Sequence, residues 1–178
     1  LSVCLFVCFF RPSKVGMETT MATAPSWSES AATLLWWHVL FDTWFYWTHR
    51  ALHHRLIYRF AHKQHHEFRE PTGVAALYAH PFEDIVVNAG STFIGPLLYP
   101  SHGLVFLVYL ALRFHETTDA HSGYDFPWSP WRWLGRLHGG ARRHDWHHSH
   151  INGNYGGFWF WDWLCGTDCE WREWERKR

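Results

Sequence analysis

The chain carries no excess charge of either sign, because its 16 Lys and Arg residues balance 16 Asp and Glu residues. A balanced chain has no long-range field that would attract nucleic acid or an acidic partner. The sequence also lacks a P-loop and a G-x-G-x-x-G motif, so nothing in it favours nucleotide binding. Its 178 residues are enough for one domain. We therefore expect no nucleic-acid partner.

Cysteine is scarce, with four residues at positions 4, 8, 165 and 169. The C-x-x-x-C spacing of each pair matches no common zinc motif. We therefore predict free thiols.

Charged residues are absent from the range 85–112. Helix-breaking residues interrupt this run near its middle, at Gly95, Pro96, Pro100 and Gly103. The pattern predicts an apolar hairpin at about 84–114. Each arm would reach only about 20 Å, short of the ~30 Å hydrocarbon core of a bilayer. The arms are therefore either extended at their ends or re-entrant, and a buried hairpin in a soluble protein is the alternative. A second apolar run at 31–47 favours the membrane.

Basic residues flank this hairpin on both sides, and the positive-inside rule then places both flanks in the cytosol. Tryptophan, with 14 residues, favours the bilayer interface. We predict an all-α, integral membrane helical bundle in which the hairpin joins a cytosolic, His-rich helical cap. Residues 1–30 are expected to form a poorly defined N-terminal segment, because the apolar stretch LSVCLFVCFF is too short to span a bilayer.

Histidine is abundant, and many of the 16 residues fall in three arrays. These are HRALHH at 49–54, HKQHH at 62–66 and HDWHH at 144–148. On an α-helix, residues i, i+3 and i+4 share one face, so each array can present its imidazoles to one point. Neutral imidazole is the commonest metal ligand. Eight imidazoles are too many for one tetrahedral zinc ion, which predicts two ions of higher coordination without a bridging carboxylate.

These arrays lie in longer motifs, namely YWTHRALHHRLIYRFAHKQHHEFREP, YAHPFED, DAHSGYDFPWS and GGARRHDWHHSHINGNYGGFWFWDWLCGTD. Together they resemble the fatty acid hydroxylase/sterol desaturase superfamily of membrane di-iron oxygenases over about residues 35–171. The resemblance implies that residues 31–178 form the catalytic domain. It also assigns metal ligands to three histidine boxes: His49 and His53; His62, His65 and His66; His144, His147 and His148.

Two further histidines are candidate ligands because of their place beside the hairpin. His121 follows the return of the hairpin to the cytosolic face, and His80 precedes the hairpin. His54 offers a second spacing from His49, although His53 shares a helical face with His49. The remaining histidines should be dispensable: His38, His102, His115, His138 and His150.

The stretches AHPFE and HSGYDFPWS resemble the C4-methylsterol oxidase branch in particular. This resemblance implies an enzyme of the endoplasmic reticulum membrane, with two Fe ions and O2, that oxidises the C4-methyl group of a sterol precursor. Electrons would come from NAD(P)H through cytochrome b5 and its reductase. The alternatives are a fatty acid or sphingolipid hydroxylase, a sterol desaturase, and a non-catalytic membrane metal-binding protein. The sequence departs from the branch at Leu77, Gly156 and Gly157, which bears on the substrate.

Some residues outside the boxes are candidates for supporting roles. Asp42 lies seven residues before His49 on the same helical face, and could bond a ligand histidine or reach solvent. Asp145 and Asp119 adjoin candidate ligands, and each could likewise either bond a ligand histidine or reach solvent. Asn154 and Tyr155 are expected to shape a turn and are candidate substrate contacts.

Overall fold

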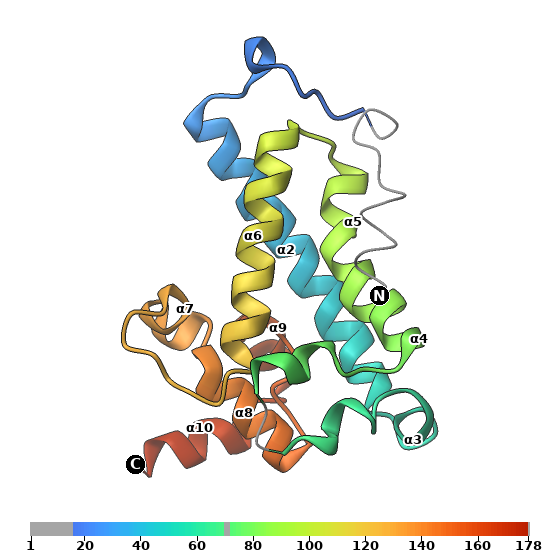
Figure 1. The fold of residues 1–178 in the computed structure, drawn as a ribbon. Helices are drawn as coiled ribbons and strands as arrows, with labels where there is room; N and C mark the ends of the chain where they lie inside the picture. Colours follow the sequence, from blue (N-terminus) through green and yellow to red (C-terminus); the bar gives the residue numbers. More distant parts are fainter. Residues whose placement is uncertain (1–15, 70–71, 178) are drawn as a thin grey trace.

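The structure is a computed structural model that describes residues 16–69 and 72–177. These residues form helices and connecting loops without a strand, which confirms the expected all-α class. Three long helices form the centre of the fold (Figure 1): α2 (Trp27–Leu52), α5 (Gly90–Leu98), which is the last part of a continuous helical segment at 81–98, and α6 (Gly103–Ala120).

The other elements of the described residues surround these three helices. They are η2 (Met21–Thr23), α3 (Tyr58–Ala61), η3 (His65–Glu67), η4 (Gly73–Leu77), α4 (Pro81–Glu83), the π-helix η5 (Asp84–Ala89), α7 (Pro130–Trp133), η6 (Gly135–Leu137), α8 (Gly140–His150), α9 (Trp159–Cys165) and α10 (Cys169–Arg176).

Helix α2 begins with a capping box. The side chain of Ser26 accepts a hydrogen bond from the backbone N–H of Glu29, and the Glu29 carboxylate accepts one from the backbone N–H of Ser26. Two N–H groups that have no partner inside the helix are thereby satisfied. The cap fixes the start of the helix whose other end carries box one.

The apolar segment forms a helical hairpin, but its bend differs from the expected one. Helix α6 follows α5 after a turn at residues 99–102, whereas Gly95 and Pro96 lie inside α5. A Cβ atom on Gly95 would lie 2.8 Å from Cδ1 of Trp37, so this glycine permits the close approach of α5 to α2. The fully buried Trp37 is part of a core cluster with Phe93 and Phe106.

The segment before α2 packs against this hairpin. Met17 is buried in the same core cluster, and the backbone N–H of Gly103 donates to the Glu18 carbonyl at 2.8 Å. His102 at the hairpin turn donates from Nε2 to the Thr20 carbonyl at 3.0 Å. The stretch LSVCLFVCFF, with Cys4 and Cys8, lies outside the described residues. Cys165 and Cys169 are free thiols, as expected.

The outer faces of the three long helices are apolar and exposed: Leu35, Trp36, Val39, Trp44 and Trp47 on α2, Leu97 and Leu98 on α5, and Leu104, Leu107, Val108 and Phe114 on α6. Within residues 16–69 and 72–177, none of the helices combines the length and the apolar character needed to cross a bilayer.

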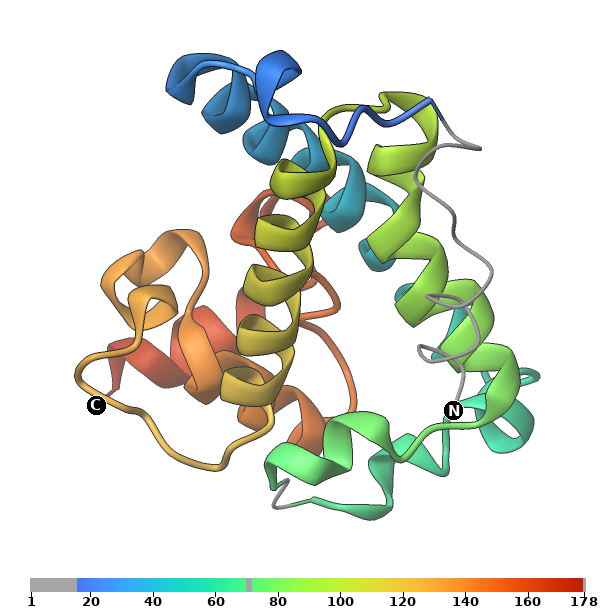
Figure 2. The ribbon, with the colours of Figure 1, turned by 45° about the horizontal axis from the view of Figure 1, so that its top comes forward.

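The histidine-bearing segments gather at the end of the long helices that is opposite the α5–α6 turn (Figure 2). Helix α8 packs against α6, and the chain from α3 to α4 runs below α2 and α5. The end of α2, the segment after α3, the end of α6 and the whole of α8 are thereby brought together.

Candidate metal centre

The three boxes occupy different local structures. In box one, His49 lies in the last turn of α2 and His53 is the C-cap residue of that helix. Box three lies within α8. Box two was expected on one α-helix, but His62 is the C-cap of α3 and the next two ligands lie in η3. The backbone N–H of His65 donates to the His62 carbonyl at 3.0 Å, so a tight turn brings these imidazoles to one side.

Nine imidazoles converge in two groups whose ligand nitrogens all lie within 4.8 Å of one another inside each group. The first group contains His49, His53, His62, His66 and His147. The second contains His65, His121, His144 and His148. Boxes two and three thus each contribute to both groups, and the groups adjoin, since the His66 and His148 ring centroids are 4.7 Å apart. No carboxylate of the described residues belongs to either group.

Distances between Nε2 atoms fit metal coordination. Nε2 of His62 lies 3.1, 2.9 and 3.0 Å from Nε2 of His49, His53 and His66. In the second group the distances are 3.3 Å for His65–His121, 2.9 Å for His121–His144 and 3.1 Å for His144–His148. Two ligands at right angles, each about 2.1 Å from an ion, would be about 3.0 Å apart.

Hydrogen bonding cannot account for the first group. A ring nitrogen carries either one N–H or one lone pair, so Nε2 of His62 can make one conventional hydrogen bond and not three. Nδ1 of His49 lies 2.8 Å from the Tyr155 carbonyl and must donate to it, because a carbonyl oxygen has no proton. In the neutral ring, Nε2 of His49 is then a bare lone pair that faces His62. A cation between these nitrogens would resolve both conflicts.

Burial keeps the nine imidazoles neutral. It lowers the pKa of His49 and of His121 to about 4, that of His66 to about 3 and that of His148 to about 2. In the other five, burial and the neighbouring imidazoles lower the pKa as well. Neutral imidazole is the form that binds metal, so the site is ready for cations at neutral pH.

Glu83 is a residue of this site that the sequence reasoning missed. Its Oε2 lies 2.8 Å from Nδ1 of His62, and its side chain is buried. Burial and the neighbouring Asp84 raise the pKa of Glu83 to about 9. Without metal the side chain is therefore protonated at neutral pH, whereas a cation on His62 would favour its carboxylate form, which orients the ligand ring and increases its basicity. In the sequence, Glu83 is the acidic residue of AHPFE and lies just before an apolar run, which was the available indication of a buried carboxyl group.

A cavity lies between α2, α5 and α6 and reaches the second group. Its apolar walls include Phe41, Phe45, Phe93, Leu110 and Phe114, and its lining also includes His121 and His144. No member of the first group lines it. All three residues at which the sequence departs from the sterol branch, Leu77, Gly156 and Gly157, line this cavity.

Tyr155 lies beside the first histidine group, and its neighbour Asn154 lines the cavity. The Tyr155 carbonyl accepts from His49, and the Tyr155 ring lies 4.9 Å from that of His53 between centroids. Asn154 lines the cavity, is fully buried, and has no hydrogen-bond partner for either side-chain polar atom. An unsatisfied buried amide at a cavity wall is available to a bound ligand.

Other candidates lie outside both groups. His54 is exposed, so the structure favours His53 of the two alternatives. His80 accepts at Nδ1 from the Phe82 N–H and caps α4. Asp42 was a candidate partner for a ligand histidine, but its Oδ1 accepts from the Phe158 N–H at 2.9 Å. Asp119 accepts from Ser129 at 2.9 Å, and Asp145 is half-buried on α8.

The histidines expected to be dispensable have other partners. Nδ1 of His38 donates to the Leu34 carbonyl, and His150 donates to that of Trp146. His115 accepts from the Trp131 indole, and His138 contacts the Glu116 carboxylate at 2.9 Å. With His102 at the hairpin turn, all five are outside the two groups.

Comparison with known proteins identifies one matching family and several similar proteins. The family described as fatty acid hydroxylase matches residues 34–167. Methylsterol monooxygenase 1 of Danio rerio is 44% identical over 149 residues, which cover 83% of this chain and 50% of that protein. The Rattus norvegicus protein of the same name is 42% identical over 154 residues, which cover 86% of this chain and 52% of that protein.

Very-long-chain aldehyde decarbonylase GL1-8 of Oryza sativa subsp. indica is 42% identical over 163 residues, with 89% of this chain and 60% of that protein covered. The chain therefore spans about half to three fifths of the length of these relatives. No solved structure matches it. The resemblance inferred from the histidine boxes and from the sterol-branch motifs is confirmed, and the chain belongs to the fatty acid hydroxylase family.

Proposed function

We propose that the chain is a membrane di-iron oxygenase that uses O2 to oxidise the C4-methyl group of a sterol precursor. The observation that carries this proposal is the convergence of nine neutral imidazoles, seven buried and two half-buried, in two adjoining groups. Two iron ions bound there would supply an oxidant, made from O2, that can attack an unactivated C–H bond. The protein holds the ligands neutral, orients them and excludes water from them.

The cavity supports a lipid substrate. Four phenylalanines and several aliphatic side chains line it, together with polar and charged residues such as Arg113 and Glu116, and it reaches His121 and His144 of the second group. Four imidazoles leave more coordination positions open than five do, so the second group suits the approach of O2 and substrate better than the first. The unsatisfied Asn154 amide could bind a polar group of the lipid beside the reacting carbon.

The sterol assignment rests on the motifs DAHSGYDFPWS and YAHPFED and on the two relatives named methylsterol monooxygenase 1. The rice relatives named very-long-chain aldehyde decarbonylase have similar identity, at 42% and 43%, and favour a second candidate, a reaction on a long-chain aldehyde. The cavity residues Leu77, Gly156 and Gly157 are where a difference in substrate would act.

We further propose that the three long helices lie in the endoplasmic reticulum membrane with the histidine groups on the cytosolic side. The exposed apolar faces of α2, α5 and α6 support this placement, since contiguous exposed apolar surface marks an interaction with lipid or protein. Electrons would come from NAD(P)H through cytochrome b5 and its reductase. In sealed microsomes, added protease should cut the region 132–178, and protection of that region would contradict this topology.

The test of the reaction is expression in a yeast that lacks its own C4-methylsterol oxidase. Growth without ergosterol and loss of the accumulated 4,4-dimethylsterol would support the sterol reaction. Conversion of an added long-chain aldehyde, or a new hydroxylated fatty acid, without sterol turnover would favour another member of the family. Bound metal without any oxidised product would favour a non-catalytic metal-binding protein. The His62→Ala variant, at equal protein level, is the inactive control.

A further inference from the structure

The loop that follows α8 holds two imidazoles of the first histidine group. Its Gly153 carbonyl accepts from Nδ1 of His147 at 2.7 Å, and its Tyr155 carbonyl accepts from Nδ1 of His49 at 2.8 Å. These two histidines come from α8 and α2. The position of one short loop therefore sets the orientation of ligands from two separate helices.

This loop has a backbone conformation that needs support. Asn154 has φ +54°, in the left-handed region that side chains rarely adopt, and so does Ile151 with φ +67°. Gly153 has φ +93°, and a Cβ atom there would lie 2.3 Å from the Thr167 carbonyl oxygen. Such a conformation persists only where surrounding contacts hold it.

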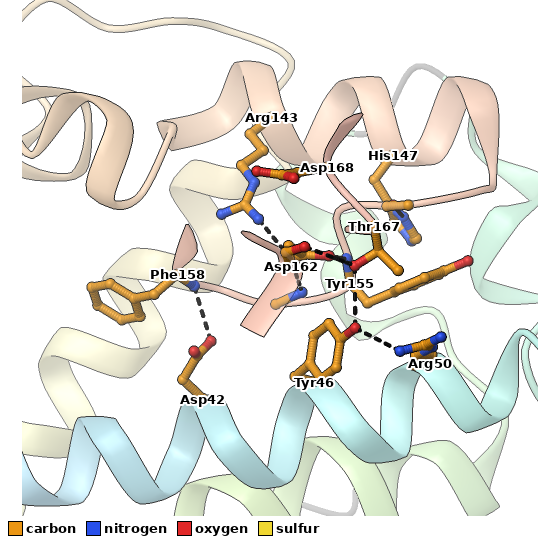
Figure 3. Close-up of polar contacts among 12 residues, drawn as sticks. Asp42, Tyr46, Arg50, Arg143, His147, Tyr155, Phe158, Asp162, Thr167 and Asp168 are labelled. Atoms are coloured by element: carbon orange, nitrogen blue, oxygen red, sulfur yellow. Dashed lines mark hydrogen bonds and ion pairs between the residues drawn. The ribbon is translucent and has the colours of Figure 1, made fainter. Parts of the chain in front are cut away.

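The fully buried carboxylate of Asp162 provides that support (Figure 3). It accepts four hydrogen bonds: from the Tyr155 N–H at 2.9 Å, the Gly156 N–H at 2.8 Å, Nη2 of Arg143 at 2.6 Å and Oγ1 of Thr167 at 2.6 Å. Arg143 lies one turn before His147 on α8. Asp162 thus ties the loop, α8 and the start of the segment after α9 to one point.

The second histidine group lacks this connection. Nδ1 of His121 donates at 2.8 Å to the carbonyl of Thr117 in its own helix. Neither loop carbonyl contacts a member of the second group among the hydrogen bonds of residues 16–69 and 72–177. The loop carbonyls that Asp162 supports therefore lead to the first group alone, whereas its contact with Arg143 reaches α8, which carries ligands of both groups.

We propose that Asp162 is a positioning residue for the first metal site, acting through the loop carbonyls on His49 and His147. This inference rests on the proposed ligand role of the two groups. Loss of the carboxylate should free the loop and turn both imidazoles, while the second group keeps its own supports. Loss of such outer contacts lowers metal affinity about 10–100-fold.

The test compares Fe²⁺ binding to the full chain with and without the carboxylate, in detergent and without oxygen. The wild type should bind two ions per chain, and Asp162→Asn should keep one after dialysis against a weak chelator. Adding His144→Ala to Asp162→Asn should remove the remaining ion, whereas adding His62→Ala should not. A second site lost with the first, or two ions retained, would overturn the proposal. Fewer than two ions in the wild type would instead count against the metal sites themselves.

Two further variants complete the test. Asp168→Asn is the matched control, because Asp168 is also buried but pairs with Arg172 at 3.1 Å, so both ions should stay. Thr167→Val removes one of the four hydrogen-bond donors to the Asp162 carboxylate. This variant tests the proposal if Asp162→Asn does not fold. It should weaken the first site several-fold and leave the second unchanged. Equal weakening of both sites would overturn the proposal.

Discussion

The replacement Glu83→Gln should have opposite effects on the metal-free and the metal-bound protein. Burial raises the pKa of Glu83 from 4.5 to about 9, so the folded, metal-free chain binds a proton that the unfolded chain releases above pH 4.5. The stability due to this group is therefore fully present below about pH 4.5 and is lost as the pH rises towards 9. At pH 7 the loss relative to low pH is about 3 kcal/mol.

Glutamine does not titrate, so the variant avoids this loss. Metal-free Glu83→Gln should be more stable than the wild type at pH 7, by up to about 3 kcal/mol, and the difference should shrink towards pH 5. Metal binding should change in the other direction. A cation on His62 favours a carboxylate 2.8 Å from Nδ1, and its removal should weaken the first site about 10–100-fold, or about 1.4–2.7 kcal/mol.

The assay combines thermal unfolding of the chelator-treated protein with Fe²⁺ titration against a competing chelator. Glu67→Gln is the matched control, because this acid directly follows box two but its side chain is exposed and accepts from the Tyr78 hydroxyl. The control should match the wild type in both measurements. The reasoning is refuted if Glu83→Gln binds Fe²⁺ as tightly as the control, or if its metal-free form is the less stable one.

Three further outcomes are expected. His147→Gln should abolish binding at the first site and turnover, whereas His102→Gln should leave both near wild type; similar behaviour of the two variants would show that the ligand assignment is wrong. The metal-free chain should lose stability as the pH falls from 6.5 towards 4, because burial lowers the pKa of His49 and of His121 to about 4, the unfolded chain takes up protons first, and these two histidines together outweigh the opposite contribution of Glu83; a flat stability profile over this range would contradict it. Gly95→Val should cost about 1–3 kcal/mol in thermal unfolding, since its side chain would meet Trp37, and an unchanged melting temperature would contradict the close packing of α5 on α2.

The sequence predicted the convergence of the imidazoles better than the details of the fold. Repeated i, i+3 and i+4 spacing is sufficient to place imidazoles on one side, and it works for box two although that box is not on one α-helix, because a tight turn keeps the same spacing. The choice of His121 came from the topology of the hairpin. Its presence in the second group follows from α6 returning to the end of α2.

The residues that the sequence did not reveal act through tertiary contacts. Asp162 is one acid in an aromatic run, and its role depends on a loop that folds back over it. Asp42 was a candidate partner of a ligand histidine by helical spacing, but its carboxylate accepts a hydrogen bond from the backbone N–H of Phe158. Gly95 was expected to break a helix, but the local signal was overridden by the packing of Trp37.

Metal stoichiometry tests the two-site proposal most directly. Plasma emission analysis of the full chain loaded with Fe²⁺ should give two ions per wild-type chain. His62→Ala and His144→Ala, one from each group, should each give one ion, and the double variant should give none. A single ion in the wild type, or loss of both ions in each single variant, would contradict two separate sites built from these histidines.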